Sequence, residues 1–494
     1  MKRRMIGVAY VVLLLTAACG ARLDKGVRTQ LANAALHPSV AGAQSGGDVG
    51  GSAVTTPGGA ATSPSGSNSA TPGAIQPGGS SAAGGARQQT GTQSPGANAP
   101  QASVPAGGNG GATDLGVTAT SITTGNVSDL SGPVPGLFQG GVYGVDAYYA
   151  YINSQGGIFG RQLKMSSADG QTDCTTNQNA HSSLLPRVFA FVGSFSIYDD
   201  CGTQVMQQHQ DVPDVSYALG SATKKNTVNQ FPPSIAPAGY QDGMFCSWAK
   251  EFGSAVTHVG AIFSNLPAAS FSERMIEHAA VSGCGWHFTD SIPVGATQTT
   301  FNAELSKMQS DGVKVVFEIG TTQDRIAEMK READQQGWKP IFISPVAYAS
   351  NFVELVGSAQ EAEGIVGSNL YSLFFSPDDA HNIPEVALYQ QWMHLTHPDA
   401  AEDLYSMYSW AAAKLFVQEL TAVGPKITRK AFIDAIRAVH AFDAAGLLTQ
   451  SDIGGHKPGN CYVMWRIHNG QYARYNTPAS QYRCDGEFVP YTGS

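Results

Sequence analysis

Two hydrophobic periodicities alternate along the chain from about residue 115 to its end. The run 121–127 has the composition of a buried strand, and 139–155 carries apolar side chains at helical spacing until Gly156 and Gly157 stop the helix. Further runs with the character of buried strands cover residues 188–192, 256–264, 313–319, 341–344 and 364–371. This alternation predicts an α/β fold.

The segment 312–345 shows one repeat of the pattern clearly. A β-rich run ends at Gly320, where the hydroxyls of Thr321 and Thr322 are placed to cap the helix that follows. Gly337 then provides a helix stop before the next strand begins. Repeated strand–helix–strand units form a parallel sheet with helices on both faces. Because ligands of such sheets bind at the carboxyl ends of the strands, we expect the functional residues in the loops that follow them.

The start of the chain has the pattern of an export signal. Three basic residues at positions 2–4 precede an apolar run, 5–15, that is too short to span a membrane. Small residues then lead to Cys19, and this placement resembles a bacterial lipobox, although Thr16 stands where leucine is usual. We expect residues 1–18 to be a lipoprotein signal peptide and Cys19 to carry a lipid anchor. The alternative is an ordinary secretory signal with an incidental cysteine.

A low-complexity stretch follows the signal. Residues 39–113 are dominated by Gly, Ala, Ser, Pro, Thr and Gln, and such a composition cannot bury enough apolar surface to offset the entropy of ordering. We expect 19–114 to form a disordered, lipid-anchored linker. Its roughly 70 flexible residues would reach about 45–50 Å on average.

The cysteines predict a disulfide framework. The chain has seven, and setting Cys19 aside leaves an even number in an exported protein. Many pairings are open, and we expect neighbours along the chain to pair: Cys174–Cys201, Cys246–Cys284 and Cys461–Cys484. No Cys-x-x-Cys pair occurs, so we expect no metal and no cofactor.

Charge and motifs exclude several function classes. The formal net charge is −9, and no basic cluster follows the first few residues, which argues against a nucleic-acid partner. The loop 193–196 lacks the spacing of Gly-x-Ser-x-Gly, and neither a phosphate-binding loop nor His-Glu-x-x-His is present. We therefore expect a protein that is not an enzyme.

Several stretches resemble one known family. Asp-Leu-Ser-Gly-Pro at 129–133 is similar to the opening loop of the type I periplasmic binding proteins that serve branched-chain amino-acid transporters. The segment 153–161, an Asn followed by Gly-Gly-Ile-x-Gly-Arg, resembles that family's helix-end signature, in which two glycines end the helix. Residues 362–365 and an Ala-rich helix at 408–420 add support. The resemblance covers about residues 116–475.

The resemblance implies two Rossmann-like lobes joined by three crossings, with the ligand clamped between them in a clamshell that closes by a hinge. Lobe 1 would comprise residues 115–238 and 370–450, and lobe 2 would comprise 239–369 and 451–494. In this family, backbone amides and hydroxyls in the loops after the strands hold the ligand. By position, the resemblance implies these ligand-binding residues: Phe138, Ser194, Phe195, Ser196, Tyr217, Ala218, Ser270, Phe271, Thr321 and Tyr348.

Alternatives stay open for these residues. Ser194 and Ser196 could instead cap the next helix, and those of lobe 2 could serve as caps or core. One departure bears on the ligand, because amino-acid binders of the family carry an acid just after a proline where this chain has Pro345-Val346. An ammonium enclosed without a counter-charge is costly. We therefore expect a small molecule that is uncharged, aromatic or carboxylated, and not a free branched-chain amino acid.

Together these features predict the lipid-anchored, extracytoplasmic substrate-binding component of an ABC importer, held at the cell membrane. Its partners would be a small-molecule ligand and separate permease and ATPase subunits, and we expect a monomer. The alternative is a ligand sensor or a scavenging lipoprotein that uses the same clamshell without an importer.

Overall fold

The computed structural model describes residues 103–132, 135–136, 138–217, 227–234, 239–265, 267–295 and 298–493. The expected signal peptide, Cys19, most of the low-complexity segment and Ala218 lie outside the described residues. Within the described ranges, no helix combines the length and the apolar character needed to cross a membrane.

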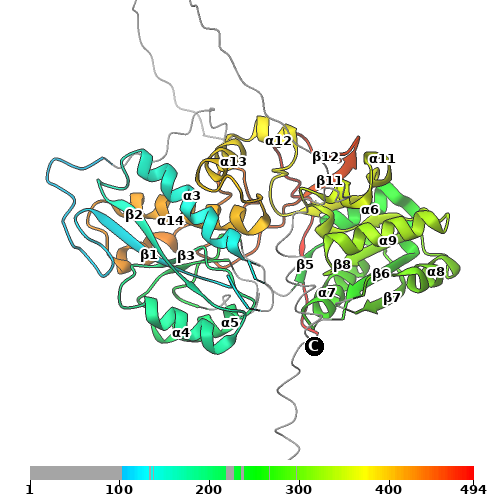
Figure 1. Cartoon of the computed structure of the whole chain (residues 1–494), viewed down its shortest axis with the longest axis horizontal. Helices are drawn as coiled ribbons and strands as arrows, with labels where there is room; N and C mark the ends of the chain where they lie inside the picture. The colour runs from blue at the N-terminus through cyan, green and yellow to red at the C-terminus, as the bar shows by residue number, and fades with distance from the viewer. Residues whose placement is uncertain are drawn as a thin grey trace, which may run out of the picture. The chain divides into compact units, whose positions relative to one another are not determined.

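Two larger sheets organise the described part, in separate α/β halves that we call lobe 1 and lobe 2 (Figure 1). The sheet of lobe 1 has four parallel strands in the order β2-β1-β3-β4. Its strands are β1 (Ser121–Ser128), β2 (Gln162–Asp169), β3 (Phe191–Val192) and β4 (Asp214–Val215). Its helices are α3 (Gln139–Ser154), α4 (Cys174–Leu184), α5 (Asp199–Gln208), α12 (Pro377–Asn382), α13 (Pro384–Thr396), α14 (Leu404–Val423) and α15 (Arg429–Ile436).

Lobe 2 has a seven-stranded sheet in the order β12-β11-β10-β9-β8-β6-β7, parallel except for β11 and β12. Its strands are β6 (Val259–Ser264), β7 (Phe288–Val294), β8 (Val315–Ile319), β9 (Ile341–Ile343), β10 (Val366–Asn369), β11 (Val463–His468) and β12 (Gln471–Arg474). Its helices are α6 (Gly243–Phe252), η1 (Gly253–Thr257), α7 (Pro267–Cys284), α8 (Asn302–Ser310), α9 (Gln323–Gln335), η2 (Pro345–Ala347), α10 (Phe352–Val356) and α11 (Ala359–Ala362). A separate antiparallel pair joins β5 (Gly239–Gln241) to β13 (Phe488–Pro490).

The chain passes between the lobes three times: between β4 and α6, between β10 and α12, and between α15 and β11. Each lobe therefore combines segments that are far apart in the sequence. The mixed α/β architecture expected from the hydrophobic pattern is confirmed.

Helix α14 forms the centre of lobe 1 and packs along α3. Its first turn is held by a capping box, in which the Asp403 carboxylate accepts from the Ser406 backbone N–H at 2.7 Å and Ser406 reciprocates. Deeper in the helix, the Trp410 ring meets Tyr148 of α3 edge-on at 4.8 Å, and its indole N–H donates to Glu385 at 2.7 Å. The long apolar face of α14 thus becomes core because α3 packs along it, while α15 and the strands β3 and β4 contact it as well.

The glycine signature after α3 makes a tight turn that buries an arginine. Gly157 has φ +73°, and a Cβ there would lie 2.1 Å from the carbonyl oxygen of Arg161, so only glycine fits. The Arg161 guanidinium is fully buried and is satisfied by carbonyl oxygens alone. These carbonyls belong to Asn109, Gly111, Thr118 and Pro425. The arginine thereby ties the first described segment to lobe 1.

Some expected boundaries and one cap are corrected by the structure. Five predicted strands are shorter than their apolar runs. Residues 188–190 precede β3, 256–257 belong to η1, and 313–314 precede β8, while β9 ends at Ile343 and β10 covers only Val366–Asn369 of the run 364–371. Thr322 is the N-cap residue of α9, but its hydroxyl bonds the carboxylate of Asp324 instead of capping the backbone. An apolar run predicts burial and does not predict how far the ladder of hydrogen bonds extends.

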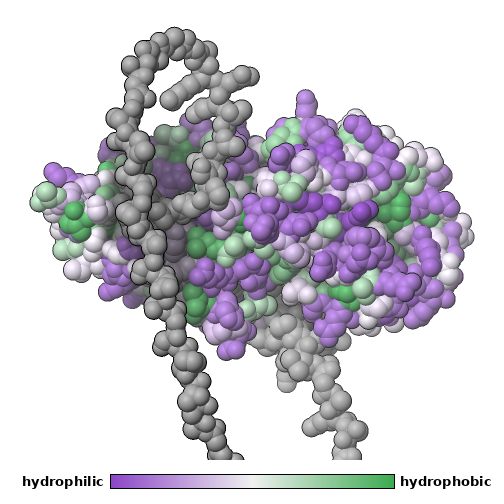
Figure 2. All heavy atoms as spheres, turned by 90° about the horizontal axis from the view of Figure 1, so that it is seen from above, coloured by the Kyte–Doolittle hydropathy of each residue, from purple (hydrophilic) through white to green (hydrophobic). Residues whose placement is uncertain are grey.

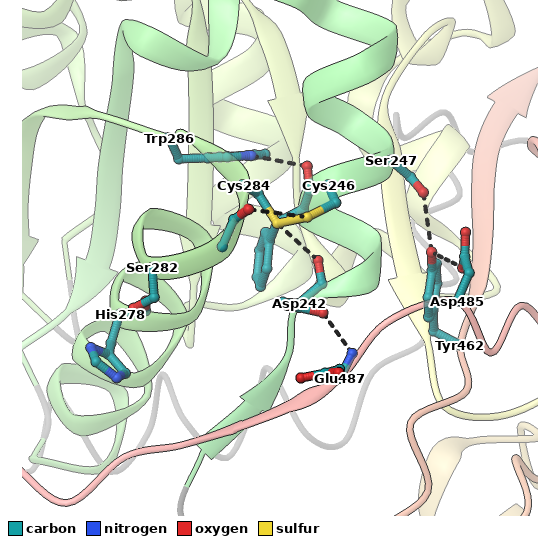
Figure 3. Close-up of a disulfide and its surroundings, with 12 residues drawn as sticks. Asp242, Cys246, Ser247, His278, Ser282, Cys284, Trp286, Tyr462, Asp485 and Glu487 are labelled. Atoms are coloured by element: carbon teal, nitrogen blue, oxygen red, sulfur yellow. Dashed lines mark hydrogen bonds between the residues drawn. A yellow bond between two sulfur atoms is a disulfide. The ribbon is translucent and has the colours of Figure 1, made fainter.

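The three disulfides pair neighbouring cysteines as expected: Cys174–Cys201, Cys246–Cys284 and Cys461–Cys484. Figure 3 shows the second of them, which joins α6 to the last residue of α7. Beside it the C-terminal segment docks on lobe 2, because the Glu487 N–H donates to the Asp242 carboxylate at 2.7 Å and the Tyr462 hydroxyl donates to Asp485 at 2.7 Å (Figure 3).

Candidate functional site

A cleft of about 560 Å³ is lined by residues of both lobes, and its volume is that of a small-molecule site. Lobe 1 contributes the turn before α14, the start of that helix and the loop after β4. Lobe 2 contributes η2 and the residues that follow it, and the end of β10. Several of these segments follow the carboxyl ends of parallel strands, where ligands of α/β sheets bind.

Aromatic rings make up much of the cleft wall. Six tyrosines and two phenylalanines line it: Tyr217, Tyr240, Tyr348, Tyr371, Tyr405, Tyr408, Phe374 and Phe375. The rings of Tyr217 and Tyr408 lie 4.4 Å apart, and Tyr371 meets Tyr408 edge-on at 5.9 Å. The chain of ring contacts continues from Tyr371 to Tyr348 at 6.1 Å. A continuous aromatic surface therefore runs from lobe 1 to lobe 2.

Tyr348 and its neighbours are held by hydrogen bonds. The Tyr348 hydroxyl accepts from the Phe375 N–H at 2.8 Å, and the Tyr472 hydroxyl accepts from the Ala349 N–H at 3.0 Å. The same Tyr472 hydroxyl contacts the Ala347 carbonyl. The backbone of the loop after β9 is thus fixed in place, so the part of the wall that it forms is preorganised.

Beneath this wall, a buried carboxylate joins the ends of two strands of lobe 2. Glu318 is fully buried and accepts from the Thr321 backbone N–H at 2.6 Å, the Thr321 hydroxyl at 2.7 Å and the Ser344 hydroxyl at 2.6 Å. Burial raises the pKa of Glu318, while these three hydrogen bonds lower it. Since Ser344 directly precedes η2, Glu318 positions the loops that carry Gln323, Pro345 and Val346 into the cleft.

Two carboxylates reach the cleft from lobe 1. Glu402 and Asp403 precede α14 and line the cavity, and burial raises the pKa of both. No lysine or arginine is among the described residues that line it. The cleft therefore has a negative side, in lobe 1, and an uncharged aromatic remainder.

The opening loop after β1 is organised by two aspartates. Asp129 is fully buried, accepts from the Ser196 hydroxyl at 3.0 Å and from the Ile197 N–H at 2.9 Å, and has its pKa raised by burial. Asp169 accepts from the N–H groups of Leu130 and Ser131 at 2.9 and 3.2 Å. These bonds connect the loops at the carboxyl ends of β1, β2 and β3, so they fix the conformation of lobe 1 at that edge of its sheet.

The structure brings together only some of the residues that the resemblance implied. Tyr217 and Tyr348 line the cleft. Phe138 and Phe195 lie directly behind it, since Phe138 packs on Tyr405 at 4.7 Å and Phe195 stacks on Tyr217 at 5.2 Å.

The remaining implied residues have other neighbours. The Ser194 hydroxyl accepts from the Val127 N–H at 3.0 Å, and Thr321 is bonded to Glu318. Ser270 and Phe271 lie on α7, where the Phe271 ring meets Tyr491 at 5.6 Å. Ligand roles for them stay predictions.

Ser194 and Ser196 line a second, much smaller cavity. Its volume is about 10 Å³, the room that one water occupies, and its other polar lining includes Asn177 and Gln230. Neither atom of the Asn177 amide has a hydrogen-bond partner in the described part of the chain. This cavity is internal to lobe 1.

One group of possible metal ligands occurs in the described residues, namely Asp242, Cys246 and Cys284. Its two sulfur atoms form the disulfide of Figure 3, so they are not available as thiolates. The group therefore fits no metal ion.

Sequence reasoning missed Tyr371, Tyr405, Tyr408 and Glu402 as cleft residues. Tyr405 and Tyr408 fall on one helix face at i and i+3, which is also the signature of a core stripe. The sequence feature that could have identified Glu402 is its position, with Asp403, just before a helix. Acidic residues there predict a capped helix start, and helix starts lie at the ends of the sheet layers, where ligands bind.

Comparison with known proteins agrees with this architecture. A family model described as "Periplasmic binding protein" matches residues 121–471. The structure is similar to a fatty acid ABC transporter substrate-binding protein from Thermomonospora curvata, with a TM-score of 0.59, 17% identity, and coverage of 73% of this chain and 93% of that one. A comparison with curated protein sequences found no match.

Two ligand-bound structures are similar as well. A branched-chain amino acid ABC transporter protein from Thermus thermophilus with bound valine gives a TM-score of 0.58 at 14% identity, covering 76% of this chain and 97% of that one. The branched-chain amino acid transporter substrate-binding protein of Streptococcus pneumoniae, in complex with isoleucine, gives a TM-score of 0.55 at 14% identity, covering 75% of this chain and 99% of that one. At these identities the likeness shows a common fold. The family match over most of the chain, together with the two-lobed fold and its cleft, shows that this chain belongs to the periplasmic binding protein family.

Proposed function

We propose that this protein is the lipid-anchored, extracytoplasmic substrate-binding component of an ABC importer and that it clamps a small molecule in the aromatic cleft. Members of its family are solute-binding proteins that work with ABC transporters, and not enzymes. The observation that carries the proposal is the cleft itself, about 560 Å³ with walls from both lobes. Closure of the lobes would bring these walls together on the ligand.

We further propose that the ligand is not a free branched-chain amino acid. The acid that amino-acid binders of the family carry after the proline is replaced by Val346, which lines the cleft beside Pro345. An amino acid bound in the family's manner would place its ammonium against this apolar side chain, at the cost of leaving the charge unpaired. The acids of this cleft, Glu402 and Asp403, instead come from lobe 1.

The surface supports the expectation of a monomer. In the view of Figure 2, apolar residues form small separate patches among polar ones on the face that is seen. The large apolar side chains that are exposed in the described part are dispersed along the chain: Val104, Leu115, Ile197, Tyr198, Val228, Val281 and Leu395. A monomeric receptor at the membrane surface would suit delivery to a permease.

A thermal-shift screen of the mature chain against amino acids, aromatic acids, sugars and amides tests the proposal, because a ligand that binds only the folded state raises its melting temperature. We expect a shift with a compound other than leucine, isoleucine or valine. Small-angle scattering of the same complex should show a more compact particle, the sign of lobe closure. Micromolar binding of leucine or valine would refute the ligand assignment, and binding without compaction would refute the clamp. Ligand uptake that depends on a permease would separate an importer component from a sensor.

A further inference from the structure

The charged groups of the cleft point to the chemistry of its ligand. In the part of the lining that the structure describes, Glu402 and Asp403 are the charged side chains, and both precede α14. Two neighbouring acids beside an aromatic wall would repel an anionic ligand group. The question is whether either carboxylate is available to a ligand.

Asp403 is committed to its helix. Its Oδ1 accepts from the Ser406 N–H in the capping box of α14, at 2.7 Å. Helix α3 also lies against it, because a Cβ on Gly140 would come within 2.4 Å of the same oxygen. The carboxylate of Asp403 therefore serves the helix start, and the positive end of the helix dipole favours its charge there.

Glu402 has no comparable commitment. Within the described residues its side chain makes one hydrogen bond, in which Oε2 accepts from the Gln390 amide at 3.1 Å. Among the described residues no donor is found for Oε1, no lysine or arginine pairs with the group, and the charged neighbour is His394. Burial raises the pKa of Glu402, while the Gln390 amide and the nearby His394 lower it. A desolvated carboxylate in this position gains more from a ligand cation than an exposed one would.

The aromatic wall suits a cation of this kind. Tyr405 follows Glu402 by three residues and lines the same cleft, and Tyr408 packs against Tyr217. Tyrosine faces carry the negative side of the ring quadrupole, so they attract an ammonium and also cover flat apolar surface. One side of the cleft thus carries the Glu402 carboxylate, and the rest of its wall consists largely of aromatic rings.

We propose that the ligand is an organic cation, an amine with an aromatic or flat apolar body and no carboxylate, and that Glu402 is the residue that selects its charge. This inference rests on the proposed function, because it takes the cleft as the ligand site. It places the charge-recognition group at the start of α14 in lobe 1 and not in the loop at Val346 in lobe 2, and it replaces the uncharged or carboxylated ligand expected from the sequence by a cationic one.

Four probes with one phenylethyl skeleton test the charge preference by calorimetry on the mature chain. They are 2-phenylethylamine, 2-phenylethanol, 3-phenylpropionate and L-phenylalanine, which differ in carrying a cation, no charge, an anion or both charges. We expect the amine to bind at least about tenfold more tightly than the other three, since a charge-assisted hydrogen bond in a desolvated site has roughly this effect. A matched neutral binder as tight as the amine would overturn the inference.

The variant Glu402→Gln isolates the residue. Glutamine keeps the size of the side chain and can still accept from Gln390, so only the charge is lost. We expect the amine to lose about tenfold or more in affinity, and 2-phenylethanol to change little. Glu354→Gln is the matched control, because Glu354 lies on α10, is exposed and does not line the cleft. Equal amine affinity in the Glu402→Gln variant and the control would overturn the assignment.

The outcomes also separate this inference from the proposed function. If a neutral or anionic compound of the wider screen binds and compacts the protein while no amine does, the cation assignment fails and the clamshell receptor stands. If no compound stabilises the protein at all, both fail.

Discussion

Removing the disulfide Cys461–Cys484 is expected to destabilise lobe 2 and to release the C-terminal segment. Cys461 lies just before β11, and Cys484 lies in the segment that leads to β13. Strand β13 pairs with β5, a strand on the first crossing between the lobes. The double variant Cys461→Ala, Cys484→Ala therefore tests whether this covalent link holds the segment against the crossing.

The magnitude follows from the loop that the bond closes. The two cysteines are 23 residues apart. In the chain-entropy treatment, a loop of this length lowers the entropy of the unfolded chain enough to stabilise the fold by about 3.4 kcal/mol at room temperature. For a unit of about 150–250 residues, each kcal/mol shifts the melting temperature by about 2–4 °C, so we expect a loss of roughly 10 °C.

Differential scanning calorimetry measures the loss, and hydrogen exchange of the β13 amides measures release of the segment. The control removes Cys174–Cys201, whose separation of 27 residues predicts a similar loss of about 3.5 kcal/mol in lobe 1. Only the first variant should expose β13 to exchange. An unchanged melting temperature, or β13 amides as protected as in the parent protein, would refute this account.

Further variants test charged groups at three sites. Glu318→Ala should lose about 2–4 kcal/mol of unfolding free energy and weaken the binding of cleft ligands, because three donors lose their acceptor. Glu318→Gln should lose little. Denaturant unfolding compares the two variants, and equal losses would contradict the role of Glu318 as the acceptor that holds the two loops. Arg474→Met should lose about 3–5 kcal/mol by stranding the buried carboxylate of Asp379, and adding Asp379→Asn should restore part of it in a double-mutant cycle. Burial raises the pKa of Asp146 to about 6, so the folded state binds more protons than the unfolded state between about pH 4 and pH 6, and stability should fall as pH rises through that window. Asp146→Asn should remove this pH dependence. The change in stability across the window should be under about 1 kcal/mol, because the Asp146 side chain is 44% exposed. An unchanged pH dependence in urea melts of the variant would exclude Asp146 as its source.

The C-terminal segment shows how far local patterns reach. The matched family model ends at residue 471, yet Tyr472 fixes the loop after β9, and Arg474 pairs with Asp379 of lobe 1. These contacts join positions about a hundred residues apart, and no periodicity in the sequence connects them. The segment was expected to belong to lobe 2, but its links to the cleft loop were not foreseen.

The sequence by itself indicated the α/β class and the places of several strands and helices, and it favoured the pairing of neighbouring cysteines that the structure has. Each of these depends on neighbours along the chain: apolar spacing sets which face is buried, Gly157 ends α3 because only glycine fits the turn, and short loops favour nearby cysteines. Tertiary structure alone decided the composition of the cleft. Tyr371, Tyr405 and Tyr408 join the expected Tyr217 and Tyr348 there because two sheets and three crossings bring distant segments together. Burial likewise raises the pKa of Glu402, since desolvation depends on what packs around a carboxylate and not on its neighbours in sequence.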